Sequence, residues 1–272
     1  NNISVKLSSL VPKAEWDPLN FDGATKVVSG KLAQLFRAGY RNGVAVNVDM
    51  ESYAVRDLTL AIFKRAFEGD EFCAHYNAGI VVQAYLCDAE GSLRDLLAWI
   101  QGVRRTVTIR LVKGAYWDHE VMNAEERGWP VPVLMDKAAT DRQFNKLAEM
   151  ILTARKYGVP VKLAAGSHNA ESLAHTIALA EELGELAGLE IQVLYGMGDD
   201  IRRAVRALLN CFAPPSADLT GRAEGYPVRV YTPCGELVPS MAYLVRRLLE
   251  NTSQQSFLGA QLGVKGGGRG EK

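Results

Sequence analysis

The sequence predicts an α/β fold of the (βα)8 TIM-like barrel type, and three observations predict it. Short β-branched runs alternate with helical patterns from end to end, which favours βα units around a parallel sheet. The strand runs are almost continuously apolar, as at residues 79–82, which is typical of a sheet covered on both faces. Polar side chains follow nearly every run. A barrel gathers all such strand ends around one mouth, whereas an open sheet uses only a few.

Seven segments have the strand pattern, and they span residues 3–7, 44–48, 79–84, 106–112, 159–163, 189–194 and 227–231. Helical periodicity predicts eight helices, near residues 24–38, 52–68, 91–103, 118–127, 137–157, 170–184, 198–209 and 238–251. The strand count is one short of eight, and the deficit falls at the amino end. We therefore expect residues 1–258 to form a barrel whose first βα unit is missing from this chain, and residues 259–272 to form a flexible glycine-rich tail.

The composition excludes several classes of function. The 31 Lys and Arg residues balance the 31 Asp and Glu residues, so net charge gives no reason to expect nucleic-acid binding. The four cysteines form no CxxC pair, which favours free thiols in the reducing cytoplasm. The four histidines have no convincing metal-ligand spacing, so we expect no metal site. No apolar run approaches the roughly 20 residues of a membrane span.

Two lysines and an aspartate end predicted strands. Lys6 and Lys113 have apolar neighbours, so burial disfavours their charge unless an anion is near. Each is interpreted as a Schiff-base nucleophile, as an anchor for a carboxylate or phosphate, or as a lysine whose stem lies along the barrel rim. Asp49 follows segment 44–48 and is expected to pair with Lys6 or with an arginine on a neighbouring strand, in either a structural or a catalytic ion pair.

Two turns follow later strands. Ser167, His168 and Asn169 precede the helix expected near residue 170, where Ser and Asn can cap the helix and its free N–H groups attract phosphate. Gly196-Met197-Gly198 follows the next strand and is more simply a tight turn. The dinucleotide fingerprint and the P-loop are both absent, so a nucleotide would be held in some other way.

The last predicted helix has a polar face made of Tyr243, Arg246, Arg247 and Glu250. Two adjacent guanidinium groups can bind a carboxylate bidentately. An ordinary solvated helix face is the simpler interpretation of the same pattern.

Eight segments in order along almost the whole chain resemble the proline dehydrogenase family, which includes a domain of bacterial proline utilization A proteins. They are Ile3-Ser-Val-Lys-Leu-Ser-Ser9, Val46-Asn-Val-Asp49, Val81-Val-Gln-Ala-Tyr85, Arg110-Leu-Val-Lys-Gly-Ala-Tyr-Trp-Asp118, Ser167-His-Asn169, Tyr195-Gly-Met-Gly198, Arg229-Val-Tyr-Thr-Pro233 and Tyr243-Leu-Val-Arg-Arg-Leu-Leu-Glu-Asn251.

The resemblance implies a distorted (βα)8 barrel with FAD at its mouth. It implies oxidation of L-proline to pyrroline-5-carboxylate by hydride transfer to the flavin N5, in proline catabolism. The electrons would pass to a membrane quinone, with peripheral contact at the inner face of the cytoplasmic membrane. An aldehyde dehydrogenase domain or enzyme is the implied partner.

The resemblance also implies roles for individual residues. Lys6, Arg246 and Arg247 would bind the proline carboxylate, and Asp49 would position an arginine. Tyr116, Tyr231 and Tyr243 would wall the proline ring. The implied FAD contacts are Gln83, Arg110, Val112, Lys113, Gly114, Ala115, Trp117, Ser167, His168, Asn169 and Glu250. The chain departs from the family near Asp136, where relatives usually carry an arginine that helps to hold the adenosine half of FAD.

Two other functions fit the same residues. A lyase or aldolase would use Lys113 to form a Schiff base with a carbonyl substrate and would bind no flavin. A barrel without turnover would bind an amino acid or flavin only. The ordered series of segments argues against the first, and the missing strand favours the second.

Overall fold

A computed structural model describes residues 1–69, 76–212, 228–235, 241 and 245. These residues form two compact units. The first comprises residues 1–166 and 174–190, and the second comprises residues 167–173 and the described residues from 191 onward.

A parallel sheet of five strands forms the centre of the first unit. Each strand pairs with the next in chain order. The strands are β1 (Asn2–Val5), β2 (Ala45–Val48), β3 (Ala78–Gln83), β4 (Val107–Val112) and β5 (Val161–Gly166). Because all five run in the same direction, the residues that follow them lie at one edge of the sheet. The order in sequence therefore brings the predicted strand-end residues of this unit to one place.

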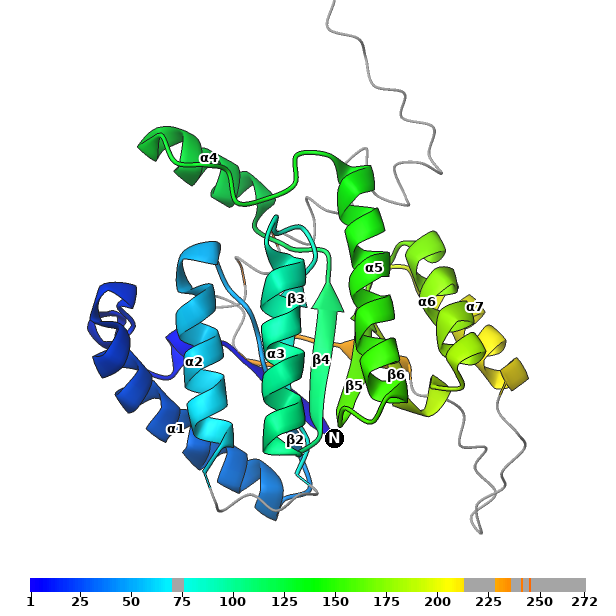
Figure 1. Ribbon diagram of the computed structural model, residues 1–272, viewed down its shortest axis with the longest axis horizontal. Coiled ribbons are helices and arrows are strands. Elements are labelled where there is room, and N and C mark those ends of the chain that lie inside the picture. The colour runs from blue at the N-terminus through cyan, green and yellow to red at the C-terminus, as the bar shows by residue number, and fades with distance from the viewer. Residues whose placement is uncertain (70–75, 213–227, 236–240, 242–244, 246–272) are drawn as a thin grey trace, which may run out of the picture. The chain divides into compact units, whose positions relative to one another are not determined.

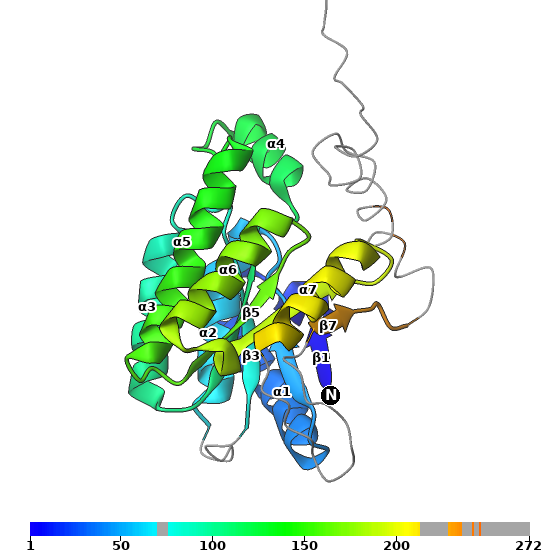
Figure 2. The same ribbon diagram turned by 90° about the vertical axis from the view of Figure 1, so that its right-hand side faces the viewer.

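Helices of the first unit cover one face of this sheet, as both views show (Figures 1 and 2). They are α1 (Phe21–Arg41), α2 (Arg56–Phe67), α3 (Ala89–Val103) and α5 (Lys137–Lys156). Aromatic rings fill the space between α1, α2 and α3, where Phe36 meets Phe63 edge-on with 6.1 Å between centroids and Phe63 stacks on Phe67 at 5.7 Å. Helix α4 (Trp117–Arg127) extends from the carboxyl end of β4.

The second unit contains a parallel strand pair. β6 (Leu189–Leu194) pairs with β7 (Val228–Tyr231), and the register aligns Leu194 with Tyr231. Helix α7 (Asp199–Phe212) lies beside β7 (Figure 2). Helix α6 (Ala170–Leu183) begins after residues 167–169.

The seven predicted strands and the first seven predicted helices are all present, with small differences in their bounds. The segment predicted at 3–7 is a strand only to Val5, because Leu7–Ser9 forms a 3-10 helix that buries Leu7. The segment predicted at 159–163 runs instead from Val161 to Gly166, because Ala164 and Ala165 are buried strand residues without β-branching. The predicted helix near 238–251 and the tail lie outside the described residues, apart from residues 241 and 245.

Short 3-10 helices were not predicted. Besides Leu7–Ser9 (η1), they are η2 (Lys13–Glu15), η3 (Pro18–Asn20), η4 (Tyr53–Val55) and η5 (Leu186–Gly188). The cysteines that the structure describes, Cys87, Cys211 and Cys234, are free thiols. Within the described residues, no helix has the length and apolar character needed to cross a membrane.

Candidate active site

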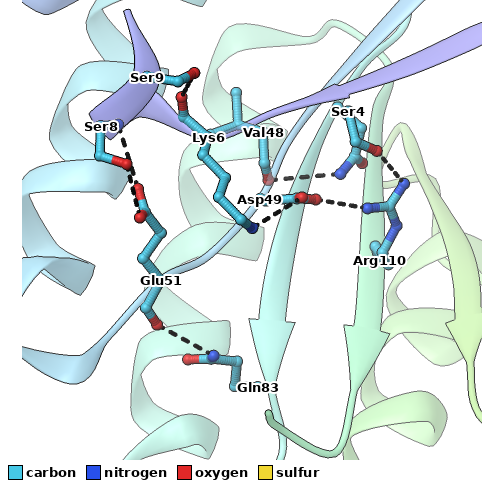
Figure 3. Close-up of polar contacts among 10 residues, drawn as sticks. Ser4, Lys6, Ser8, Ser9, Val48, Asp49, Glu51, Gln83 and Arg110 are labelled. Atoms are coloured by element: carbon cyan, nitrogen blue, oxygen red, sulfur yellow. Dashed lines mark hydrogen bonds and ion pairs between the residues drawn. The ribbon is translucent and has the colours of Figure 1, made fainter. Parts of the chain in front are cut away.

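A cluster of three charged side chains is formed by Lys6 and Asp49, which directly follow β1 and β2, and Arg110, which lies in the carboxyl half of β4 (Figure 3). Asp49 Oδ2 lies 3.3 Å from Lys6 Nζ, and Asp49 Oδ1 lies 2.8 Å from Arg110 Nη1. The sequence predicted that Asp49 pairs with Lys6 or with a neighbouring arginine, and the structure shows both pairs. Two cations share one carboxylate here, so the three side chains together carry a net positive charge that favours an anionic ligand.

Arg110 is the more rigidly held of the two cations. Its side chain is only 7% exposed, and its Nη2 donates to Ser4 Oγ at 2.9 Å. The Lys6 side chain is 38% exposed, so its ammonium group remains accessible from solvent while it contacts Asp49. Lys6 is therefore the cation of the cluster that a ligand from solvent can reach.

The turn after Lys6 is fixed by hydrogen bonds that were not predicted. Ser8 donates to the Glu51 carboxylate twice, from its backbone N–H at 3.3 Å and from its hydroxyl at 2.8 Å (Figure 3). Ser9 Oγ donates to the Lys6 carbonyl at 2.6 Å. These bonds stop β1 and turn the chain at Lys6. The two serines in Lys6-Leu-Ser-Ser9 were a sequence signal for them, but nothing in the sequence identified Glu51 as the acceptor.

Gln83 ends β3 beside this cluster and is 3% exposed. Its Nε2 donates to the Glu51 carbonyl at 3.3 Å, while its Oε1 is buried and accepts no hydrogen bond within the described residues. A buried acceptor left unsatisfied costs about 1 to 3 kcal/mol. A ligand that donates an N–H would remove that cost, and the edge of a flavin ring carries such a donor. The flavin contact at Gln83 stays a prediction.

Lys113 follows β4 and forms an ion pair with Asp141 of α5. Asp141 also contacts Lys137 Nζ at 2.9 Å. Burial by itself would raise the pKa of Asp141, but the hydrogen bonds and positive charges of Lys113 and Lys137 outweigh it, so the pKa is lowered. A carboxylate that stays ionised favours the ammonium form of Lys113. This pairing argues against Lys113 as a neutral Schiff-base nucleophile.

The turn between β4 and α4 requires a glycine. Gly114 has φ +137°, and a Cβ added there would lie 2.5 Å from Tyr85 ring atoms. Val112, Ala115 and Tyr116 flank it as half-buried residues, and Tyr116 is the N-cap of α4. Trp117 Nε1 donates to the Leu134 carbonyl at 3.0 Å, which fixes the indole on the loop before α5. The turn is therefore held tightly, and it consists entirely of predicted site residues, Lys113 to Trp117.

In the second unit, the predicted capping residues do cap α6. Asn169 Oδ1 accepts from the Ser172 N–H at 2.9 Å, and Ser167 Oγ accepts from the Asn169 N–H at 3.1 Å. His168 Nε2 accepts the Leu194 N–H at 3.0 Å. Tyr231 ends β7, and its carbonyl accepts from the Tyr195 N–H at 2.9 Å. Whether residues 167–169 also bind phosphate stays a prediction.

Asp136, where the resemblance led us to expect an arginine, caps helix α5. Its carboxylate accepts from the N–H groups of Ala138 at 3.1 Å and Ala139 at 3.0 Å. The remaining predicted residues lie outside the described residues: Tyr243, Arg246, Arg247 and Glu250.

Comparison with known proteins identifies the family. The model of a family described as proline dehydrogenase matches residues 1–260. The chain belongs to the proline dehydrogenase family. The bifunctional protein PutA of Escherichia coli is 30% identical over 261 residues, which cover 94% of this chain and 18% of that protein. Proline dehydrogenase 1 of Bacillus subtilis is 25% identical, over 95% of this chain and 68% of that protein.

Solved structures of relatives confirm the predicted fold class. The crystal structure of proline utilization A from Bdellovibrio bacteriovorus, inactivated by N-propargylglycine, matches with a TM-score of 0.84 and 39% identity. The match covers 96% of this chain and 25% of that one. The chain therefore has the α/β TIM-like barrel type of fold and spans about a quarter or less of the PutA proteins that it matches.

Proposed function

We propose that this chain oxidises L-proline to pyrroline-5-carboxylate with FAD as the hydride acceptor. The observation that supports it most directly is the Lys6, Asp49 and Arg110 cluster beside the unsatisfied Gln83 Oε1, in a chain matched by the proline dehydrogenase family over residues 1–260. The cluster provides positive charge for a carboxylate, and Gln83 provides an acceptor for a flavin N–H.

Recognition of the substrate follows from its charges. Proline carries a carboxylate that must be neutralised in a partly buried site, and Lys6 is the accessible cation there. Arg246 and Arg247 are proposed to complete this clamp. Asp49 fixes both Lys6 and Arg110 and so positions the clamp. Tyr116, together with Tyr231 and Tyr243, is proposed to wall the ring and hold the reacting carbon in place.

Flavin binding is proposed to use the residues that end β3 and β4. FAD would supply the two-electron acceptor. Arg110, held by Asp49 and Ser4, would favour negative charge on a neighbouring group, and the Gly114 turn gives backbone close access. The proposed contacts are Gln83, Arg110, Val112, Lys113, Gly114, Ala115 and Trp117, with Ser167, His168, Asn169 and Glu250.

The balance of the reaction defines the partners. The ring carbon next to nitrogen loses a hydride and the nitrogen loses a proton, which leaves a C=N bond. The reduced flavin is proposed to pass its electrons to a quinone, through peripheral contact with the inner face of the cytoplasmic membrane. An aldehyde dehydrogenase domain or enzyme is the proposed consumer of the product, and the bifunctional name of the Escherichia coli relative supports a fused partner.

Steady-state kinetics with purified chain, FAD, L-proline and a soluble quinone test this function. We expect saturable formation of the cyclic imine. Lys6→Ala should raise KM for proline at least tenfold, because it removes the accessible cation, whereas Lys31→Ala, at an exposed position of α1, should not change KM. No turnover by a chain with bound FAD would contradict the proposal. Covalent trapping of a carbonyl substrate on Lys113 by borohydride would favour the lyase instead.

A further inference from the structure

Glu120 is a buried acidic residue that the proposed reaction does not use. Arg110 and Glu120 are the charged residues classed as buried in the part of the chain that the structure describes. Arg110 has Asp49 as its counter-ion, whereas Glu120, at 3% exposed, forms no ion pair within the described residues. Burying a carboxylate without a cation is costly unless it accepts hydrogen bonds. The group that donates a hydrogen bond to Glu120 therefore indicates the role of this buried carboxylate.

That partner is a backbone group on a different strand-end segment. Glu120 Oε1 accepts from the Tyr53 N–H at 2.7 Å. Tyr53 begins η4, in the segment between β2 and α2 that also carries Asp49 and Glu51. Glu120 lies one turn into α4, where its own N–H donates to the Tyr116 carbonyl at 2.9 Å. The Glu120 carboxylate thus connects two parts of the chain. One is the segment that carries Asp49, and the other is helix α4, which begins at Tyr116 and Trp117.

The segment after β2 contacts the neighbouring strand ends through several other bonds. Arg56 lies over the Tyr53 ring, 4.7 Å from its centroid, and its Nη1 contacts Asp88 at 2.5 Å. Glu51 contacts Ser8 and Gln83, as described above. The Glu120 bond ties this segment to α4. Without it, the backbone at Tyr53 would lose the acceptor that α4 provides.

Tyr85 lies beside the turn that precedes α4 and close to Glu120. Its ring packs against Gly114, and its backbone bonds to the Lys113 carbonyl and the Leu134 N–H, both at 2.7 Å. Burial, and then the negative charge of Glu120, raise the pKa of the Tyr85 phenol well above its usual range. The phenol therefore stays neutral, and the buried Tyr85 ring supports the turn at Gly114.

We propose that Glu120 is a positioning residue: by accepting the Tyr53 N–H, it holds the Asp49 segment and the start of α4 in one arrangement, so that the carboxylate-binding cluster and Tyr116 face the same substrate. This inference rests on the proposed function. It assigns Glu120 no contact with proline or FAD.

Paired variants of Glu120 test the acceptor. Glu120→Gln keeps an oxygen that can accept the Tyr53 N–H, whereas Glu120→Ala removes it. We expect the Tyr53 amide to exchange its hydrogen at least tenfold faster in Glu120→Ala and within about threefold of wild type in Glu120→Gln. The same Ala variant should raise KM for proline at least tenfold with a smaller change in kcat, and Gln should restore it.

Variants at Tyr53 test the donor and keep the proposal falsifiable if Glu120→Ala does not fold. Tyr53→Pro removes the N–H, and Ser52 already has the extended backbone (φ −69°, ψ 161°) that a following proline requires. Tyr53→Ala loses the same ring but keeps the N–H. We expect Tyr53→Pro to raise KM for proline at least fivefold above Tyr53→Ala.

Two controls separate positioning from general destabilisation. Glu125→Ala, exposed on α4, should change neither exchange nor kinetics. Phe36→Leu, in the aromatic core, should lower the melting temperature without changing KM. Faster Tyr53 exchange with unchanged KM would overturn the proposal, as would equal kinetic losses in the Gln and Ala variants. A wild-type chain that binds FAD without proline turnover would instead refute the proposed function, and the exchange result would still decide whether Glu120 holds Tyr53.

Discussion

Asp49 is the residue that organises the candidate active site. Its two oxygens accept from different cations, Lys6 on one side and Arg110 on the other, and Arg110 is almost fully buried. A buried cation that loses its anion keeps its desolvation cost without compensation. Asp49 therefore affects both the stability of the fold and the orientation of Lys6.

Replacing Asp49 with asparagine should lower the free energy of unfolding by about 3 kcal/mol, because the buried Arg110 guanidinium then loses the negative charge of Asp49. Urea denaturation of wild type and variant measures the difference. The matched control is Asp200→Asn, which removes a carboxylate paired with Arg203 on the solvent-exposed side of α7 and should cost less than about 0.5 kcal/mol. Equal losses in the two variants would show that the buried cluster does not stabilise the fold.

Asp141 predicts a pH dependence of stability. Its pKa is lowered in the folded chain, so the folded state binds the proton less tightly than the unfolded chain does. The stabilisation is complete above the ordinary carboxyl pKa of about 4 and is lost as the pH falls through the folded pKa below it. The difference in unfolding free energy between wild type and Asp141→Asn should therefore shrink on acidification below about pH 4.

Urea denaturation at a series of pH values checks this. Asp118→Asn, which removes an exposed carboxylate of α4 without an ion pair in the described residues, should show no such trend. A constant difference between wild type and Asp141→Asn at every pH would contradict the expected linkage.

Some of these residue contacts could be predicted from sequence and others could not. Asp49 was expected to pair with Lys6 or an arginine because each follows or ends a strand, and parallel strands bring such positions to one edge. Asp141 and Glu120 lie on helices, where their partners depend on the rotation and packing of the helix against the sheet. The sequence pattern of α4 shows Val121 and Ala124 on a buried face, but not that Glu120 joins them.

At the scale of elements, the strands were predictable because burial on both faces demands apolar residues. β6 has the predicted bounds, Leu189–Leu194, whereas β1 ends two residues early. The cause is local: Ser8 and Ser9 form side-chain hydrogen bonds that compete with strand pairing and start η1. The 3-10 helices were missed because three residues give too few positions for a periodic pattern.

Helix α5 is capped by a residue that the resemblance did not lead us to expect, Asp136. Asp136 ends the preceding loop and caps α5 through two backbone N–H groups. An arginine could not accept those bonds. The side chain at this position therefore stabilises the helix that supplies Asp141 to Lys113.

At the scale of the molecule, the regular order of strands and helices explains why a sequence alone could indicate where the site lies. Each strand of the first unit pairs with the next, so residues far apart in sequence, such as Lys6 and Arg110, lie close together in the carboxyl half of the sheet. The family match over residues 1–260 supports the proposal that this part of the sheet binds the substrate. Flavin and proline could not be derived from spacing, because many ligands suit a cationic strand end.

The most direct test is the visible absorption spectrum of the purified, FAD-loaded chain before and after L-proline is added without oxygen. We predict an oxidised flavin spectrum that bleaches on addition of L-proline, because hydride transfer reduces the bound flavin when no second acceptor is present. A bound flavin that stays oxidised at saturating L-proline would contradict the proposed function of the site.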